Sequence, residues 1–197
     1  MESTKDRIVI ASAELFRRQG LSATGLKQIS AEAQAPFGSI YHFFPGGKDE
    51  LADEVIRRSG AFYLLLFEAI MDPAPDIVTG VRAFFAGAGE TLVATDYADA
   101  CPIAVVALEV ASTNERLRMA SADVFTSWID EASRRFRDAG IGDDEAHALA
   151  LSVLCGLEGA FLFCRTLRST EAMDAAGETA AAAVRAALDV AGVGAAG

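Results

Sequence analysis

The sequence predicts an all-α protein of about nine helices. Three observations predict this fold class: apolar residues recur every three or four positions, runs of Val and Ile alternating with polar residues are absent, and Ala, Leu and Glu are abundant. Of the 197 residues, 52% are apolar and 23% are charged. This composition is typical of a folded chain with a sizeable hydrophobic core.

The first three predicted helices cover residues 5–19, 24–33 and 36–43. Gly20 follows the first of them and is a natural C-terminal stop, because glycine adopts the left-handed conformation that ends many helices. Thr24 is the candidate N-cap of the second helix. A proline opens the third helix, as is common at a first helical position. The N-terminal region therefore contains three closely spaced helices, two of them short.

The next three helices are predicted over residues 48–71, 74–94 and 102–111. The first of them opens with "KDEL", and its acidic residues favour a helix start because they compensate the positive end of the helix dipole. The segment "DPAP" ends this helix, because proline cannot continue it. The loop "TDYADACP" separates the two helices that follow.

The last three helices are predicted up to residue 138, over 143–167 and over 170–191. Ser112 and Glu115 are three residues apart and form a candidate capping box for the first of these helices. An aspartate at position 143 is the expected N-cap of the second. The third helix is rich in alanine.

The sequence favours a cytoplasmic protein that does not span a membrane. Residues 148–164 form the longest apolar run, but they include Glu158 and are few for a membrane span, so we expect a buried helix. The N-terminal segment is charged and then helical in period, unlike a signal peptide. Three cysteines without a close pair make a disulfide framework unexpected, which fits a reducing compartment.

The charge of the chain is distributed unevenly. The formal net charge is −11, which taken alone argues against nucleic-acid binding because phosphate contacts need local positive charge. The first 60 residues carry eight basic and eight acidic groups, so the whole negative excess lies after residue 60. We therefore expect a neutral N-terminal head and an acidic body.

Two short helices joined by a tight turn, at residues 26–33 and 36–43, form a helix-turn-helix pattern. In this motif one face of the second helix packs inward and the other enters the major groove. Ile40 and Phe44 are four residues apart and can face inward. Lys48 opens the next helix, where its ammonium group and the free backbone N–H groups can bind a phosphate.

Polar and aromatic side chains occupy the other positions of this motif. Thr24 and Lys27 open the first of the two short helices and can also contact phosphate. The positions that point away from the inward face are Phe37, Ser39, Tyr41 and His42. An ordinary aromatic cluster that holds short helices together is the alternative interpretation, because motif matches of this kind also arise by chance.

Residues 20–56 closely resemble the DNA-binding domain of the TetR/AcrR family of transcriptional repressors, and "IVIASAELF" matches the family's first helix. The shared residues, in order and nearly in register, are Gly20, Thr24, Ile29, Ala33, Gly38, Ser39, Ile40, Tyr41, Phe44, Lys48 and Leu51. The segments "CPIAVVALE" at 101–109 and "GLEGAFLFCR" at 156–165 resemble the branch that includes the lincomycin-resistance repressor.

The resemblance implies a helix-turn-helix DNA-binding domain at residues 1–47 and a ligand-binding and dimerisation domain at residues 48–197. A homodimer would bind a double-stranded DNA operator, and a small hydrophobic effector in the body would release it. The resemblance implies phosphate contacts by Tyr41, His42 and Lys48, flanked by Thr24 and Lys27. It also implies that Phe37, Gly38 and Ser39 face the bases.

Three positions depart from the commoner family pattern. Gln34 stands where the turn usually has Gly, and in the left-handed conformation it would cost about 1–2 kcal/mol. Phe37 stands where Lys or Arg is frequent, and Phe43 where His or Tyr is frequent. The helix at residues 36–43 therefore has few hydrogen-bond donors. Phe37 could contact a thymine methyl group or only pack on the sugar edge, and we expect DNA shape to contribute more than usual to specificity.

The resemblance also implies a ligand cavity among the fourth to eighth helices. Its expected lining is apolar and aromatic, which suits a flat hydrophobic effector: Phe62, Leu66, Phe85, Ile103, Trp128, Leu157 and Phe161. Plain core packing is the alternative for most of these residues. Glu109 or Glu158 could supply a polar anchor, although a solvated or structural role is the commoner one.

The eighth and ninth helices are expected to form a two-fold dimer interface. Small residues there would let helix backbones approach, and apolar residues would add buried area. The expected interface residues are Leu149, Val153, Gly156, Ala160, Phe163, Ala183, Val184 and Ala187. The Ala-rich last helix could instead pack only within its own chain.

The sequence does not favour an enzyme, a metal site or a cofactor. His42 and His147 are its only histidines, and neither belongs to a metal-ligand pattern. Cys155 and Cys164 are nine residues apart on one helix, so they face opposite sides and cannot share a metal. No glycine-rich phosphate loop opens a helix. Two further alternatives are a redox sensor that uses Cys101 or Cys164, and a helical small-molecule-binding protein without DNA binding.

Overall fold

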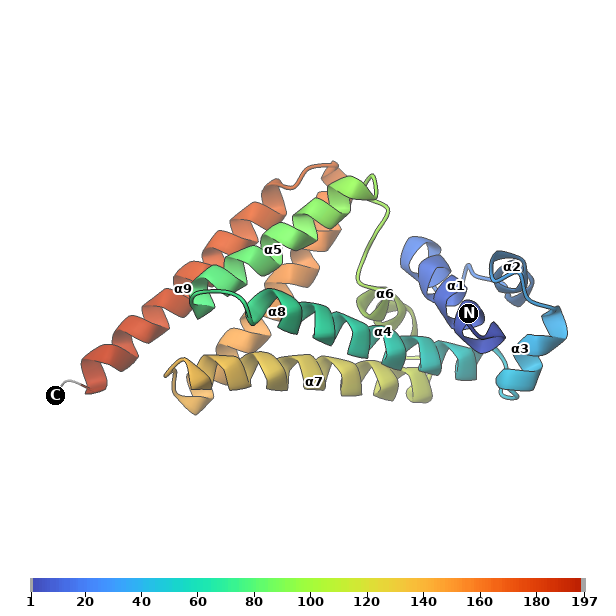
Figure 1. Cartoon of the computed structure of the whole chain (residues 1–197), viewed down its shortest axis with the longest axis horizontal. Coiled ribbons are helices and arrows are strands. Elements are labelled where there is room, and N and C mark those ends of the chain that lie inside the picture. Colours follow the sequence, from blue (N-terminus) through green and yellow to red (C-terminus); the bar gives the residue numbers. More distant parts are fainter. Residues whose placement is uncertain (1, 196–197) are drawn as a thin grey trace. The chain divides into compact units, whose positions relative to one another are not determined.

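The computed structural model describes residues 2–195, which form nine helices and no strands (Figure 1). The predicted all-α fold and its number of helices are confirmed for this part of the chain. The helices are α1 (Thr4–Gln19), α2 (Leu26–Glu32), α3 (Phe37–Phe43), α4 (Lys48–Met71), α5 (Ile77–Ala94), α6 (Pro102–Val110), α7 (Glu115–Asp138), α8 (Asp143–Leu167) and α9 (Glu171–Ala195).

The chain divides into two compact units. The first contains Met1–Tyr63 and Ala100–Phe125, and the second contains Leu64–Asp99 and Thr126–Gly197. The helices α4 and α7 therefore each contribute residues to both units. The predicted boundary between residues 47 and 48 separates two expected functions, DNA binding and ligand binding, and does not coincide with these compact units. It stays a prediction.

The first unit is built on contacts of α1 with α2, α3 and α6, and on contacts of α2 with α3 (Figure 1). These short helices present their large apolar residues to one another, because none of them can bury its apolar face alone. The largest buried side chains of this unit are Ile8, Phe16, Ile29, Ile40, Phe44, Leu51, Ile56, Ile103 and Leu117.

The turn between α1 and α2 differs in one respect from the prediction. Ser3 caps α1 by accepting the N–H of Asp6 at 3.1 Å, and Gly20 ends it with φ 83°, as expected of a glycine stop. Thr24 is not the N-cap of α2, because Gly25 holds that position. The Thr24 hydroxyl instead donates a hydrogen bond of 2.7 Å backwards to the carbonyl of Gly20.

The N-terminus of α7 also differs from the prediction. Asn114 precedes the helix, and its side-chain oxygen accepts the N–H of Leu117 at 3.2 Å. The predicted capping box of Ser112 and Glu115 is therefore wrong, since Glu115 is itself the first helical residue and its carboxylate binds Arg118 at 2.6 Å. An asparagine two residues later competes successfully for the cap position.

Two other helix starts are set by local residues. Asp76 caps α5 by accepting the N–H of Thr79 at 2.8 Å, so this helix begins three residues later than predicted. Gly142 is the N-cap of α8 and makes no side-chain cap, so the prediction that Asp143 caps this helix is wrong. Asp143 is the first helical residue, where its charge still favours the helix dipole.

The second unit has a core of α5, α8 and α9, which contact one another and lie side by side in Figure 1. Gly177 on α9 allows close packing, because a Cβ atom there would lie 2.8 Å from the Cβ of Phe85 on α5. The core includes Val81, Phe85, Leu92, Val153, Leu157, Ala160, Cys164, Met173, Ala181, Val184 and Ala187.

Two of these core helices, α5 and α8, are long and apolar enough to cross a membrane by length and composition. Both place residues in the core of the second unit. Core helices of soluble proteins have the same composition, so the two helices are weak evidence for a membrane protein.

The loop between α5 and α6 contains two adjacent left-handed residues, Asp96 (φ 51°) and Tyr97 (φ 58°). Two arginines at the end of α8 hold it. Arg165 donates to the carbonyls of Tyr97 and Ala98 at 3.3 and 3.4 Å. Arg168, itself left-handed with φ 54°, donates to the carbonyl of Asp96 at 3.2 Å and pairs with its carboxylate. These contacts compensate backbone conformations that cost on the order of 1–3 kcal/mol each.

Candidate nucleic-acid interface

The segment from α2 to α3 has the geometry of a helix-turn-helix motif. Two seven-residue helices are joined by residues 33–36. Gln34 has φ 47°, so it adopts the left-handed conformation in which a glutamine is strained. The turn is fixed by two hydrogen bonds: the N–H of Ala35 donates to the carbonyl of Ser30 at 3.0 Å, and the Ser30 hydroxyl donates to the carbonyl of Ala35 at 2.7 Å.

The inward face of the motif is apolar and closed to solvent. Ile40 is completely buried and Phe44 is 2% exposed, so the prediction that both face inward is confirmed. Ile29 and Ala33 are buried on the side of α2. The four residues anchor both short helices on the core of the first unit, which leaves the opposite face of α3 free.

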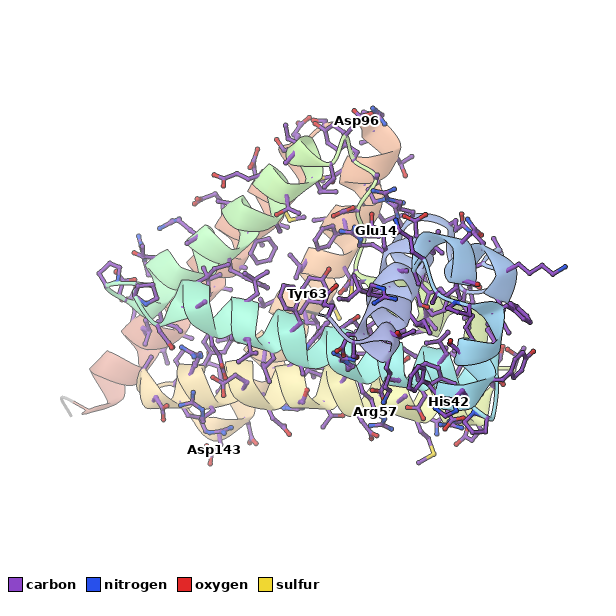
Figure 2. The ribbon with its side chains drawn as sticks, turned by 45° about the vertical axis from the view of Figure 1, so that its right-hand side comes forward. Glu14, His42, Arg57, Tyr63, Asp96 and Asp143 are labelled. Carbon is purple, nitrogen blue, oxygen red and sulfur yellow. The ribbon has the colours of Figure 1, made fainter. Side chains whose placement is uncertain are left out.

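The outward face of α3 carries aromatic and polar side chains. Phe37 is 42% exposed, Tyr41 is 49% exposed, and the imidazole of His42 is exposed on the same helix (Figure 2). The rings of Phe37 and Tyr41 meet edge to face, with 5.8 Å between centroids. Ser39 is half-buried, and the space that a Cβ of Gly38 would enter is open. This surface can therefore approach a groove closely.

Lys48 stands at the first position of α4, directly after a turn in which Gly47 has φ 71°. Tyr41 lies close to this turn, because a Cβ atom on Gly47 would be 3.8 Å from its ring. Burial lowers the pKa of Lys48 below its ordinary value, whereas the carboxylates of Glu109 and Asp49 oppose this change. The structure thus brings Tyr41 and the N-terminus of α4 together.

Thr24 and Lys27 have different environments. Thr24 is 1% exposed, and its hydroxyl also accepts the side-chain amide of Gln19 at 3.1 Å. A direct contact from this hydroxyl to DNA is therefore not supported, and we correct the expectation: Thr24 fixes the α1–α2 turn instead. Lys27 is exposed in the first turn of α2.

Ion pairs occupy many basic side chains of the first unit. Arg57 bridges Asp53 and Asp123 at 2.7 and 3.0 Å, and Arg58 binds Asp6 at 2.9 Å. Within residues 2–195, neither Lys27 nor Lys48 forms an ion pair. These two lysines precede and follow the exposed face of α3 in the sequence; Lys27 is exposed and Lys48 is half-buried.

The residues expected to line a ligand cavity are divided between the two units. Ile103 is buried in the first unit, and Phe85 and Leu157 are buried in the core of the second. Phe62 is 61% exposed and Leu66 is 43% exposed. Trp128 and Phe161, both in the second unit, are half-buried.

An open hollow of about 320 Å³ in the second unit has a different lining from the one expected. Its wall is mainly polar and charged: Met71, Asp72, Ala74, Asp76, Ile77, Arg134, Arg135 and Asp138. It contains none of the seven residues expected from the sequence, and its charged lining does not suit a flat hydrophobic ligand.

Glu109 on α6 has a role that sequence reasoning missed. It was a candidate anchor for a ligand, but its carboxylate accepts the backbone N–H groups of Leu21 at 3.0 Å and Ser22 at 2.7 Å. The bonded residues lie 87 and 88 positions away in the sequence. The resemblance of the segment "CPIAVVALE" to the family is the only sequence signal at this glutamate. No neighbouring residue indicates that it binds the α1–α2 turn.

Half of the expected dimer residues are core residues of their own chain. Val153, Ala160, Val184 and Ala187 are at most 7% exposed, within the α5–α8–α9 core, so their assignment to the interface is corrected. Leu149, Gly156 and Ala183 are half-buried, and Phe163 is 58% exposed. The exposed large side chains of α8 are Leu151, Leu162, Phe163 and Leu167, three of which the sequence analysis missed.

The cysteines are single thiols in this structure. Cys101 and Cys164, the candidates for a redox role, are buried, and Cys155 is exposed. The sulfur of Cys101 accepts the N–H of Ala104 at 3.4 Å and so caps α6. Buried thiols are usually unreactive, so the place of Cys164 in the core of the second unit favours a packing role.

Comparison with known proteins matches both parts of the chain to one family. Residues 8–55 match the family model "Bacterial regulatory proteins, tetR family", and residues 77–179 match "Transcriptional regulator LmrA/YxaF-like, C-terminal domain". An uncharacterized HTH-type transcriptional regulator of Mycobacterium tuberculosis is 34% identical over 179 residues, which cover 88% of this chain and 90% of the relative.

Two further similarities agree with this match. The HTH-type transcriptional regulator LmrA of Bacillus subtilis is 28% identical over 167 residues, which cover 85% of this chain and 89% of the relative. The crystal structure of a regulatory protein TetR from Rhodobacter sphaeroides has the same fold, with a TM-score of 0.82 at 22% identity, over 90% of this chain and 96% of that one.

The exposed face of α3 and the helix-turn-helix geometry thus lie inside the matched N-terminal segment, and most of α5 to α9 lies inside the matched C-terminal one. Members of this family are regulators of transcription and not enzymes. The chain belongs to the TetR family of transcriptional regulators, with a C-terminal domain of the LmrA/YxaF-like type.

Proposed function

We propose that this regulator is a cytoplasmic repressor that binds operator DNA as a homodimer and is released by a small hydrophobic effector. One observation carries the DNA-binding role: α3 exposes Phe37, Tyr41 and His42, while Lys27 and Lys48 lie on the helices before and after it. A local surface of this kind can bind DNA although the chain as a whole is acidic.

Phosphate contacts are proposed at the junction of α3 and α4. Lys48 offers an ammonium group beside the free N–H groups of a helix N-terminus, where the helix dipole also favours an anion. Tyr41 approaches the same turn, and His42 is exposed on the same short helix. Lys27 would contact the backbone from the first turn of α2.

Base recognition is proposed at the N-terminal end of α3, which a helix-turn-helix motif presents to the major groove. The sequence of α3, "FGSIYHF", contains no Arg, Lys, Asn or Gln, so bidentate hydrogen bonds to bases are not available from this helix. The exposed ring of Phe37 suits an apolar contact with a thymine methyl group, and the open surface at Gly38 permits close approach. Ser39 would supply a single hydroxyl.

A homodimer is proposed through the exposed side of α8. Leu151, Leu162, Phe163 and Leu167 are each at least 40% exposed, which is a large apolar surface for one helix of a soluble protein. Gly156 and Gly159 lie between them, and a Cβ at either position would meet no atom within 4 Å. Such a surface suits a second copy of the same helix packed across a two-fold axis.

The effector is proposed to be small and hydrophobic because the partly buried surface of the second unit is aromatic. Phe67, Phe84 and Phe161 pack against its core without being fully covered, and the rings of Phe67 and Phe84 meet edge to face at 5.0 Å. Aromatic side chains of this kind bind flat apolar molecules.

Selection of bound duplexes from genomic fragments, followed by footprinting, tests the DNA-binding proposal. We expect a protected site whose affinity falls steeply with salt. The variant Lys48→Ala should weaken binding to every sequence and flatten the salt dependence by about one unit of slope. Arg82→Ala is the matched control, because it removes a positive charge from an ion pair with Glu178 in the second unit.

Absence of any salt-sensitive DNA binding would contradict the repressor and favour a helical small-molecule-binding protein. The role of Phe37 has a separate test. Replacing single thymines of the selected duplex by deoxyuridine removes only the methyl group, and loss of one buried methyl contact (about 0.8 kcal/mol) should weaken binding about fourfold. Phe37→Ala should abolish this sensitivity, and an unchanged response would remove Phe37 from base recognition.

A further inference from the structure

Glu109 on α6 is bound to the turn that precedes the helix-turn-helix motif. One carboxylate oxygen accepts the N–H of Leu21 at 3.0 Å, and the other accepts the N–H of Ser22 at 2.7 Å. Hydrogen bonds to an ionised carboxylate are stronger than bonds between neutral groups. A single side chain of α6 therefore holds two consecutive backbone groups of the α1–α2 turn.

Gly20 shows that the turn is shaped around this carboxylate. Its φ of 83° is a conformation that other residues rarely adopt, and a Cβ atom at this position would collide with Oε1 of Glu109. The N–H of Gly20 also closes α1 by donating to the carbonyl of Phe16 at 2.9 Å. The same glycine thus ends α1 and makes room for the carboxylate.

A chain of hydrogen bonds leads from this turn to α2. The Thr24 hydroxyl donates to the carbonyl of Gly20 at 2.7 Å, and the side-chain amide of Gln19 donates to Thr24 at 3.1 Å and to Gln28 on α2 at 2.9 Å. Because α2 in turn contacts α3, the position of the turn affects the whole motif.

The other end of the contact is equally fixed. Ile103, Val106 and Val110 of α6 are at most 5% exposed, and α6 contacts α1. Just after α6, the amide of Asn114 donates to Asp49, in the first turn of α4, at 2.9 Å. The carboxylate of Glu109 therefore projects from a well-packed helix rather than from a mobile surface segment.

We propose that Glu109 is a positioning residue for DNA binding, which holds the helix-turn-helix motif on α6 by accepting both N–H groups of the α1–α2 turn. The inference rests on the proposed DNA-binding function and deepens it. Any displacement of α6 is passed to α2 and α3 through these two hydrogen bonds.

A purely electrostatic role for Glu109 makes the opposite prediction. This carboxylate is also close enough to Lys48 to interact with its charge. If Glu109 acted only as a negative charge near the phosphate site, its removal would strengthen DNA binding. If it positions the motif, its removal weakens DNA binding.

The variant Glu109→Gln tests the proposal, because it keeps the shape of the side chain while the amide nitrogen cannot accept a backbone N–H. We expect the amide hydrogens of Leu21 and Ser22 to exchange about tenfold faster, since a hydrogen bond to a charged group is lost. Affinity for the selected duplex should fall by about tenfold while the salt slope stays unchanged, because Glu109 does not contact phosphate. Glu90→Gln, on the exposed side of α5, is the matched control.

A double-mutant cycle gives a second measurement. Gly20→Ala should weaken DNA binding in the wild-type background, where the new methyl group collides with Glu109. In a Glu109→Ala background this collision is absent, so the effect of Gly20→Ala on affinity should be smaller by about threefold or more. Equal effects in both backgrounds would show that the two residues do not act together.

The outcomes separate the two proposals. Unchanged exchange of Leu21 and Ser22, or tighter DNA binding by Glu109→Gln, would overturn the positioning role while leaving DNA binding by the wild-type protein intact. A wild-type protein that binds no duplex would overturn the proposed function and this role together, whatever the exchange rates of the turn.

Discussion

The α2–α3 motif and the α8–α9 pair differ in how a helix chooses the face that it buries. In α3 the two kinds of face are chemically distinct: Ile40 is buried, whereas Tyr41 and His42 are exposed. In α8 the buried and the exposed faces are both apolar: Val153 is buried in the core, and Leu151 is exposed. A contrast between apolar and polar faces determines the rotation of a helix, and α8 lacks that contrast.

This difference explains which side chains sequence patterns place correctly. Around α3 the inward positions follow from the pattern, since the partners that bury them belong to neighbouring helices of the same short segment. On α8 and α9, a core face and a face available to a second chain are both apolar or small, so periodicity alone cannot distinguish them. Four predicted tests use this comparison, in order of decreasing effect.

Phe44→Ala should cost about 3–5 kcal/mol of unfolding free energy, because it removes a fully buried ring from the core of the first unit. Urea denaturation followed by circular dichroism measures the loss. Phe43→Ala is the matched control, since the neighbouring ring is only half-buried and meets the ring of His42 edge to face. Equal losses for the two variants would contradict the division of α3 and its flanks into inner and outer faces.

Val184→Ala and Phe163→Ala should separate core from association surface in the second unit. Val184 is fully buried, so its truncation should cost about 2 kcal/mol at every protein concentration. Phe163 is 58% exposed, so its truncation should instead weaken self-association, measured by sedimentation at several concentrations. A Val184 variant that dissociates without being destabilised would reverse the two assignments.

Gln34→Gly should stabilise the protein by about 1 kcal/mol, because glycine adopts the left-handed conformation of this turn without steric cost. Gln34→Ala keeps the strain and should bring no comparable gain. Thermal unfolding of the two variants checks the difference. A loss of stability in the glycine variant would show that the side chain of Gln34 contributes more than its backbone conformation costs.

Acid should weaken one ion-pair network in each unit, with the smallest effect of the four. Burial raises the pKa of Asp53, but bonds from Arg116 and Arg57 outweigh it, so the pKa lies below its ordinary value. Bonds from Arg134 and then Arg135 likewise lower the pKa of Glu131 against the effect of burial.

The sign of this acid effect follows from proton binding. A carboxyl group with a lowered pKa in the folded state binds fewer protons there than in the unfolded chain, so it stabilises the protein above its ordinary pKa of about 4. This contribution is lost as the pH falls through the lowered value. Asp53→Asn and Glu131→Gln should each flatten the fall in urea midpoint between about pH 5 and pH 3. An unchanged profile would show that the arginines do not stabilise the carboxylates.

Local signals account for most of the fold that the sequence predicts. The limits of α4 at residues 48 and 71 follow from an acidic first turn and a "DPAP" stop, and both are confirmed. The glycine that the family pattern usually has at position 34 is the one sequence signal for the left-handed conformation of Gln34. Thr24 was assigned wrongly because its hydroxyl has two competing partners, and the carbonyl behind it is preferred over the helix ahead.

Long-range contacts account for what the sequence does not reveal. The partners of Glu109 lie in the α1–α2 turn, 87 and 88 positions away in the sequence, and no periodicity connects them to α6. The ligand and dimer residues depend on the rotation of long apolar helices, which is set by tertiary packing and not by local propensity. Residues such as Val184 and Leu151 are equally apolar in the sequence, and only packing separates them.

The left-handed loop between α5 and α6 constrains the order in which the chain can fold. Asp96, Tyr97 and Ala98 acquire their partners Arg165 and Arg168 from residues 67 to 72 positions later. The loop cannot be held in its final conformation until the C-terminal end of α8 is in place, and closing so long a segment is slow. The loop should therefore be ordered late, whereas the hydrogen bonds of Glu109 to the α1–α2 turn join residues of the first unit alone.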